Sequence, residues 1–543
     1  MVKKLAWMIG GLSASLLSNP VLALETTSVG EAGIDAVRLH GPPYNLIGRK
    51  IGIGQVEIGR PGQFGLDKAV SGNRAIALAG VFLRNTKALA NTNVDPHAQN
   101  VASLMISSNK ALRGVAPGAR LYSAAVGSLK TGGQPEECLS AQHVALQNGG
   151  DVRAINFSFG ETLARDPRSN ALLDGNALLT QCIDWSARVH DVLYVIAGNQ
   201  GRGGIPIPTD NFNGVNVAFT TRQQGIFTKV DVSNLSDATG RVGGRLNGHE
   251  VNLGTRRAIS LVAPGNNISL LKPSGRATRV TGTSFAAPHV TATVALLQEF
   301  GDRQLRRAGK WMAMAGKMPA PQQLPWSLDS RRHEVMKAVM LNSADKFQDV
   351  GDGRRLGMRR TIIDKQNQDW LASDAYRDPK IPLHAQMGAG ALNAFRAYQQ
   401  FHAGQWNPSA AVPAVGWDYS RVNTSSFQDY VLKQPLQQGS FVAITLAWNR
   451  LVELEDTNKN QQYDVGERFR DRGLNNLDLY LVSAESKAPA SIACSSISEV
   501  DSVEHIFCPV ANTGKYKIRV QFRQKVNQAT QPYALAWWTV PAR

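Results

Sequence analysis

The most informative segment of this 543-residue chain is GTSFAAPHV, residues 282–290, which runs into an apolar stretch with helical spacing. Ser284 therefore falls in the first turn of a predicted helix. Unpaired backbone N–H groups and the positive end of the helix dipole favour negative charge at such a position. A nucleophile is one interpretation of Ser284, and a helix N-cap without a chemical role is the other. To become a nucleophile, the serine needs a base.

His97 is the candidate base, and Glu57 is the candidate acid that orients it. His97 begins an amphipathic helical pattern in the segment PHAQNVAS, residues 96–103. Glu57 ends the apolar, strand-like part of IGIGQVEIG, residues 51–59. The carboxyl ends of parallel strands are where open α/β sheets bind ligands. The alternatives are an ordinary surface or core histidine and a strand-end carboxylate without a partner.

Asn199 follows an apolar strand pattern and lies in a glycine-rich turn, in the segment VIAGNQG, residues 195–201. A side-chain amide can donate a hydrogen bond to an oxyanion and needs no charge to do so. Asn199 is therefore a candidate donor to an oxyanion. The alternative is an asparagine that only tolerates an unusual backbone conformation in the turn.

Short apolar runs alternate with longer helical patterns in the first two thirds of the chain. Strands are predicted at 50–56, 119–126, 152–157, 192–196 and 215–219, and helices at 97–108, 136–148, 171–190, 283–300, 334–343 and 391–400. This alternation is typical of a doubly wound parallel sheet in an α/β unit. Towards the C-terminus, short alternating strands without long helices predict a small antiparallel β-sandwich.

The first residues indicate export. Residues 1–23 combine a positively charged start, an apolar stretch and a small-residue cleavage site, which is typical of a signal peptide. The remaining chain divides into an α/β unit at 24–403, with an inserted surface segment at about 301–332, a linker at 404–416 and the β-sandwich at 417–543. We expect an exported protein, secreted or periplasmic.

The basic composition does not indicate a nucleic-acid partner. The formal net charge is +17, from 59 Lys and Arg against 42 Asp and Glu. No nucleic-acid-binding motif and no interleaving of basic and aromatic residues accompanies this charge, so we interpret it as surface character. After the signal peptide, no apolar run is long enough for a stable membrane anchor. We expect a monomer.

Seven segments in order resemble motifs of the subtilisin-like serine proteases. The first segment, IGIGQVEIG, stands where the family has a strand ending in DTG or DSG. The other six, in chain order and each followed by the family motif that it resembles, are HAQNVASLM (HGTHVAGTI), GVAPGA (GVAPxA), INFSFG (INxSxG), IAGNQG (AAGNxG), SLVAPG (DxxAPG) and GTSFAAPHV (GTSMAAPHV). The order acid, histidine, asparagine, serine is also that of the family. The resemblance covers roughly residues 45–400 and implies a subtilisin-like peptidase unit.

The resemblance implies a role for each matching residue. Ser284 would attack the scissile carbonyl, His97 would accept and return the proton, and Asn199 would help to hold the oxyanion. The substrate would lie extended against the backbone of two segments. These segments comprise Phe157, Ser158, Phe159 and Gly160, and Ile196, Ala197 and Gly198. The substrates would be proteins or peptides, and the chemistry would require no cofactor.

Glu57 departs from the family pattern, which has aspartate at this position. The extra methylene moves the carboxylate by about a bond length, and errors near 1 Å are costly in catalysis. Either the backbone at Glu57 lies farther from the histidine than in the family, or the triad is impaired. We keep Glu57 as the orienting acid. The alternative function is that of a catalytically impaired homologue that binds peptides or proteins.

Four cysteines in an exported protein predict disulfides. Cys138 and Cys182 lie on successive predicted helices that flank the same sheet, so we expect a bridge between them. Cys494 and Cys508 flank a short stretch of the C-terminal unit, so we expect a second bridge between them, across a hairpin. The alternative is four free buried thiols.

Residues 456–467 have the spacing of an EF-hand-like calcium loop. The candidate ligands are Asp456, Asn458, Asn460, the backbone carbonyl of Gln462, Asp464 and Glu467. Gln461 stands where such loops usually have glycine, and Lys459 adds repulsion. The sequence therefore allows two interpretations of this segment: a loop that binds a structural calcium ion, and a polar hairpin loop without metal. The C-terminal unit, with the strand LDLYL at 477–481, resembles β-sandwich domains appended to secreted bacterial members of the family.

Overall fold

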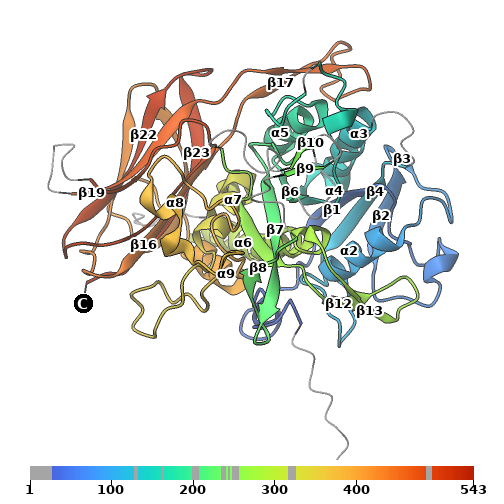
Figure 1. Cartoon of the computed structure of the whole chain (residues 1–543), viewed down its shortest axis with the longest axis horizontal. Helices are drawn as coiled ribbons and strands as arrows, with labels where there is room; N and C mark the ends of the chain where they lie inside the picture. The colour runs from blue at the N-terminus through green and yellow to red at the C-terminus, as the bar shows by residue number, and fades with distance from the viewer. Residues whose placement is uncertain are drawn as a thin grey trace, which may run out of the picture.

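The computed structural model describes residues 27–127, 133–161, 163–169, 171–198, 207–233, 240–242, 245–247, 256–315, 326–484 and 492–542. A mixed helix-and-sheet unit comes first, and a strand-rich unit, orange to red in Figure 1, packs beside it. The predicted signal peptide lies outside the described residues. Among the described residues, no helix combines the length and the apolarity needed to cross a membrane.

A nine-stranded sheet forms the centre of the first unit. Its order is β11-β7-β6-β5-β1-β4-β2-β3, with β8 beside β7. Neighbours from β11 to β2 run parallel, and β3 and β8 pair antiparallel. The strands are β1 Gly52–Glu57, β2 Leu78–Leu83, β3 Thr86–Lys87, β4 Arg120–Ala125, β5 Val152–Phe157, β6 Leu193–Ala197, β7 Val215–Gln223, β8 Ile226–Val230 and β11 Leu261–Pro264. The predicted parallel α/β sheet is confirmed.

Helices cover both faces of this sheet. α3 (Gln134–Ala145) and α5 (Leu178–His190) pack on one face, and α2 (Pro96–Ile106) and α6 (Ala287–Ala315) pack on the other. The other helices are α1 Val37–His40, α4 Gln147–Gly150, α7 His333–Asn342, α8 Asp374–Arg377 and α9 Ala394–His402. Because each face has its own apolar core, the unit is doubly wound.

Two helices differ from their predicted bounds by more than three residues. α5 begins at Leu178 and not near residue 171, because Gly175 just before it has a φ of +81°, which a helix cannot contain. α6 continues to Ala315, into the segment that we predicted as a surface insertion. Eleven of the fifteen residues 301–315 are Arg, Lys, Gln, Leu, Ala or Met, which have high helix propensity and outweigh Gly301 and Gly309.

The C-terminal unit is a β-sandwich of two four-stranded antiparallel sheets, as predicted. One sheet has the order β14-β23-β16-β21 and the other β15-β22-β19-β20. The strands are β14 Val415–Asn423, β15 Phe427–Val431, β16 Phe441–Trp448, β19 Asn476–Ser483, β20 Ile492–Ser496, β21 Val503–Pro509, β22 Tyr516–Gln524 and β23 Thr530–Trp538. Inward-facing apolar residues of both sheets form one core between them.

The described residues also form three small two-stranded sheets. They pair β9 Gly240–Val242 with β10 Arg245–Asn247, β12 Ile268–Leu271 with β13 Ala277–Val280, and β17 Val452–Glu455 with β18 Arg468–Asp471. The last pair is a hairpin that extends from the sandwich and lies over α3 and α5 (Figure 1). We call this hairpin and its connecting loop, residues 452–471, the arm.

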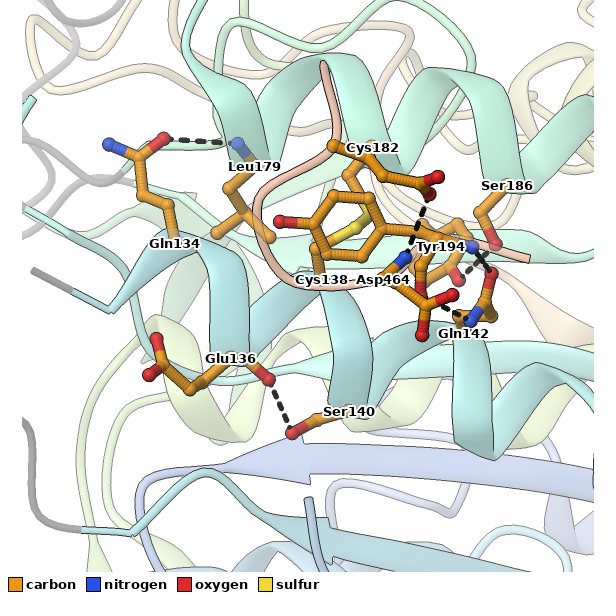
Figure 2. The surroundings of a disulfide bond; sticks show 12 residues. Gln134, Glu136, Cys138, Ser140, Gln142, Leu179, Cys182, Ser186, Tyr194 and Asp464 are labelled. Carbon is orange, nitrogen blue, oxygen red and sulfur yellow. Dashed lines mark hydrogen bonds between the residues drawn. A yellow bond between two sulfur atoms is a disulfide. The ribbon is translucent and has the colours of Figure 1, made fainter. Parts of the chain in front are cut away.

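The arm packs on a disulfide of the α/β unit. Cys138 on α3 and Cys182 on α5 are bridged, with an S–S distance of 2.03 Å. Figure 2 shows the arm loop, which carries Asp464, passing beside this disulfide and close to Gln142. The side-chain amide of Gln142 donates to the backbone carbonyl of Tyr463 and accepts from its backbone N–H. Cys494 and Cys508 form the second disulfide, so both predicted bridges are confirmed.

The two units also meet along α7. This helix packs on β16 and β23, and the apolar core of the α/β unit includes Trp417, Ala447 and Ala536 of the sandwich. The predicted linker, residues 404–416, is packed as well, since Gln405 and Val412 are buried. The sandwich is therefore tied to the α/β unit through α7, the segment 404–416 and the arm.

Candidate active site

Glu57 and His97 meet at the carboxyl edge of the central sheet. Glu57 is the last residue of β1, and His97 is the second residue of α2. Glu57 Oε2 and His97 Nδ1 are 3.3 Å apart. Glu57 is buried, whereas the His97 side chain is 40% exposed. The helix starts here because Pro96 fits its first turn and the Asp95 side chain accepts from the backbone N–H of Ala98.

The charge of Glu57 changes the acidity of His97. Burial alone would lower the pKa of His97, but the charge and hydrogen bond of Glu57, together with the charge of Asp95, raise it above its ordinary value. An imidazole with a raised pKa is a stronger base. The Glu57–His97 pair can therefore accept a proton and hold the resulting imidazolium.

Ser284 lies in the short 3-10 helix Thr283–Phe285, directly before α6. Its hydroxyl donates to the backbone carbonyl of Ser158 at 3.1 Å, and the Ser158 hydroxyl donates to the backbone carbonyl of Ser284 at 2.9 Å. A capping serine would instead accept from a backbone N–H group. The geometry therefore disfavours the interpretation of Ser284 as an N-cap.

Among the hydrogen bonds of the described residues, none joins His97 to Ser284. The His97 ring instead packs against Phe285, with ring centroids 5.5 Å apart. Catalytic hydrogen bonds are often long in the free enzyme and tighten when substrate binds. The structure thus brings His97 beside the serine segment without closing the bond between base and nucleophile.

The predicted substrate-lining backbone lies at the same sheet edge. Phe157 ends β5, and Ser158, Phe159 and Gly160 follow it. Ile196 and Ala197 end β6, and the backbone N–H of Gly198 donates to Val217. The predicted oxyanion donor, Asn199, lies outside the described residues. Since β5 lies between β1 and β6, these segments border the strand end that carries Glu57.

Sequence reasoning missed the role of Ser158 as a partner of Ser284. Its hydroxyl also accepts from the Asn156 side-chain amide at 2.7 Å, which links β5 to the nucleophile segment. The available signal was the polar pair Asn156 and Ser158, separated by one residue at the carboxyl end of β5. His289, in the same segment as Ser284, is fully buried, and burial lowers its pKa to about 4. Its Nε2 lies 2.8 Å from the Ser28 hydroxyl, so it anchors the N-terminal segment.

A second group of titratable side chains lies where the two units meet. His333 Nδ1 is 2.9 Å from Asp191 and 3.2 Å from Glu334, and its Nε2 is 3.2 Å from the side chain of Asn449 in the sandwich. Burial opposes protonation of His333, but the neighbouring carboxylates raise its pKa above the ordinary value. The acidic partners of His333 therefore favour its protonated form.

The predicted calcium ligands lie in the arm loop. The side-chain amides of Asn458 and Asn460 both donate to Asp464 Oδ2 at 2.7 Å, and Asp456 accepts from the backbone of Gln461. A half-turn of each amide would present its oxygen instead. Gln461 has a φ of +62°, the left-handed conformation that glycine usually supplies in such loops. The loop is also a hairpin connection between β17 and β18, so both earlier interpretations fit its shape.

Comparisons with known proteins agree with the motif resemblance. A family model described as "Subtilase family" matches residues 72–358. Subtilisin DY of Bacillus licheniformis is 25% identical over 215 residues, which are 38% of this chain and 65% of that protein. Subtilisin Savinase of Lederbergia lenta is 28% identical over 206 residues, which are 37% of this chain and 63% of that protein. The chain thus spans slightly less than two thirds of these relatives.

Solved structures are similar at lower identity. MycP1 with its N-terminal propeptide removed has 16% identity and a TM-score of 0.39, covering 68% of this chain and 96% of that one. A cold-adapted subtilisin-like serine proteinase has 21% identity and a TM-score of 0.34, covering 48% and 80%. These scores are low, and the fold described above rests on strand order and packing.

Proposed function

We propose that this chain, which belongs to the subtilase family, is an exported serine endopeptidase that hydrolyses protein or peptide substrates. The observation that carries the proposal is the 3.3 Å contact between Glu57 and His97 beside the segment of Ser284. Two disulfides and the predicted signal peptide support an oxidising location outside the cytoplasm.

In the proposed mechanism, Ser284 Oγ attacks the carbonyl carbon of the scissile peptide bond. His97 accepts the hydroxyl proton and returns it to the leaving amine, and Glu57 stabilises the imidazolium meanwhile. The backbone N–H of Ser284 and the amide of Asn199 would donate to the oxyanion. Water then attacks the acyl-enzyme, with His97 again as the base, and Ser284 Oγ leaves with its proton restored.

A second candidate function is binding without cleavage. The Ser284 hydroxyl donates to the Ser158 carbonyl and not to His97, and this observation favours an impaired site. Such a protein would hold an extended peptide along 157–160 and 196–198 without attacking it. The two functions differ in the reactivity of Ser284.

An active-site-directed fluorophosphonate separates them, because an activated serine displaces fluoride from phosphorus and becomes covalently labelled. We expect one label per chain, located on Ser284 by peptide mass spectrometry, and cleavage of unfolded casein. The Ser284→Ala and His97→Ala variants are the matched controls and should take up no label. Folded wild-type protein that stays unlabelled would exclude the peptidase and leave the binding function.

We also propose that the arm loop holds a structural calcium ion through Asp456, Asn458, Asn460, Gln462, Asp464 and Glu467. The left-handed Gln461 and the burial of Glu467 at the twelfth position support this proposal. Calcium should raise the midpoint of thermal unfolding in chelator-treated protein, and Glu467→Gln should abolish that rise. If calcium leaves the wild-type midpoint unchanged, the loop is a hairpin without metal.

A further inference from the structure

Gln55 is a fully buried polar residue in the middle of β1. Side chains alternate across a strand, so Gln55 lies on the same face of the sheet as Glu57, two residues later. This is the face covered by α2 and α6, since Ile53 belongs to their core, whereas Val56 belongs to the core under α3 and α5. Gln55 therefore lies one layer below the candidate active site.

The side-chain amide of Gln55 contacts two parts of that site. Its Nε2 donates to the backbone carbonyl of Ala98 at 2.9 Å and lies 3.5 Å from Glu57 Oε1. Ala98 directly follows His97 in the first turn of α2. The other carboxylate oxygen, Oε2, faces His97 Nδ1. One amide thus connects the strand that carries the acid to the helix that carries the base.

This contact bears on the extra methylene of Glu57. A glutamate has one more rotatable bond than an aspartate, so its carboxylate samples more positions unless a partner holds it. A donor at Oε1 restricts the carboxylate and leaves Oε2 directed at the histidine. Because the same amide also donates to Ala98, it fixes the position of the Glu57 carboxylate relative to the helix that carries His97.

We propose that Gln55 is a positioning residue that keeps the Glu57 carboxylate directed at His97. It would so compensate for the extra methylene of glutamate relative to aspartate. The proposal deepens the proposed function and rests on it.

A purely structural role explains Gln55 less well. Within the described residues, Gln55 Oε1 is buried without a hydrogen-bond partner. A buried amide with an unpaired oxygen is destabilising compared with an apolar side chain of similar size. An apolar residue would therefore suit the core better, unless the amide is needed for its contacts with Glu57 and Ala98.

The first test measures the position of the carboxylate without measuring activity. In Ser284→Ala protein, which cannot digest itself, NMR titration of labelled histidines reports the pKa of His97. We expect Gln55→Met to lower this pKa toward that of Glu57→Gln, because the carboxylate no longer faces the ring steadily. Asp95, the other charge that raises it, is unchanged in all variants. An unchanged His97 pKa in folded Gln55→Met protein would overturn the proposal.

Ser123 offers a matched control. It faces Gln55 across the β1–β4 ladder, is buried in the same layer, and has no hydrogen-bond partner for its hydroxyl among the described residues. Ser123→Ala should leave the His97 pKa as in the parent. If Gln55→Met does not fold, Gln55→Leu removes the same donor with a different shape and is read in the same way.

The second test uses the active protein. We expect Gln55→Met to lower kcat by about tenfold with KM unchanged, as for a small misplacement of a catalytic group. In the Glu57→Asp background, where the shorter acid withdraws from Gln55, the same change should cost less than about twofold, because coupled residues are not additive. Equal losses in both backgrounds would overturn the proposal. Absence of fluorophosphonate labelling in wild type would refute the proposed function instead, and the titration would still decide the role of Gln55.

Discussion

At the scale of single residues, the acid–base pair depends on side chains from different parts of the chain. Glu57 comes from a strand end and His97 from a helix start, and they meet because β1 ends where α2 begins to cross the sheet. The raised pKa of His97 follows from the buried carboxylate beside it. A charged partner in a buried setting acts more strongly than one in water.

Glu57→Gln keeps the shape of the acid and removes its charge. We expect kcat/KM to fall by up to about 10⁴-fold, as when the triad acid of a serine protease becomes an amide. The acid limb of the pH profile should move to lower pH, because the charge that raises the pKa of His97 is gone. Initial rates with a peptide substrate across the pH range measure both effects.

Glu57→Asp is the comparison for this prediction, since it keeps the charge. Its acid limb should stay nearer that of wild type than the limb of Glu57→Gln does. If removal of the charge leaves the acid limb in place, Glu57 does not orient His97, and the orienting acid is another residue.

The sequence predicted His97, Glu57 and Ser284 because each has a local context: a helix start, a strand end and a small-residue segment. It could not predict Gln55 or Ser158 as their partners. The contact of Gln55 with Ala98 depends on how α2 lies over β1, and the exchange of hydrogen bonds between Ser158 and Ser284 depends on the placement of α6. Such contacts arise from tertiary packing and have no local pattern.

At the scale of elements, α3 and α5 form a pair that is held from two sides. The Cys138–Cys182 disulfide joins them covalently, and Tyr463 of the arm packs in the same small apolar cluster. The pairing of these cysteines was predictable, because successive helices on one face of a sheet are neighbours. The arm was not predicted to lie there, since nothing in residues 452–471 identifies the surface that they cover.

The two disulfides should differ in their effect on stability. Cys138 and Cys182 are separated by 44 residues, and Cys494 and Cys508 by 14. On the chain-entropy model, loss of the first should lower the free energy of unfolding by about 4 kcal/mol and loss of the second by about 3 kcal/mol. Urea unfolding of the two double-alanine variants, both in the Ser284→Ala background, measures the difference. The reverse order would show that native contacts outweigh loop length.

At the scale of the whole molecule, the two units are joined by buried polar contacts in addition to apolar packing. Arg450 of the sandwich is 2% exposed, and its guanidinium lies 2.8 Å from Asp184 and donates to the backbone carbonyl of Gly175. His333 adds the contact with Asn449. The sequence predicted two units from their different periodicities. It could not predict this interface, because charged residues at a buried contact look like surface residues in the sequence.

His333 should make the stability of the molecule depend on pH. Its pKa is raised in the folded state, so its contribution is fully present below the ordinary histidine pKa and is lost as the pH rises through the folded value. His333→Gln should therefore lower the unfolding midpoint most in acid and least in alkaline solution. Differential scanning calorimetry of variant and wild type, between about pH 5 and pH 9, measures this difference.

His402→Gln is the matched control for His333, because His402 is an exposed histidine of the same unit. The His333→Gln difference from wild type should vary with pH more than the His402→Gln difference does. If the two differences vary alike, His333 is not protonated in the folded protein and only fills space at the interface.

The position of β23 has a consequence for the order in which the chain is made. β23 is the last of the described strands, yet it lies inside its sheet, between β14 and β16, and it packs on α7. During synthesis, the neighbours of this strand must wait for Thr530–Trp538 to emerge before their edges are paired. We therefore expect the β14 and β16 edges of nascent chains to remain unpaired until β23 has emerged, and chains that end before β23 to be removed by cellular proteases.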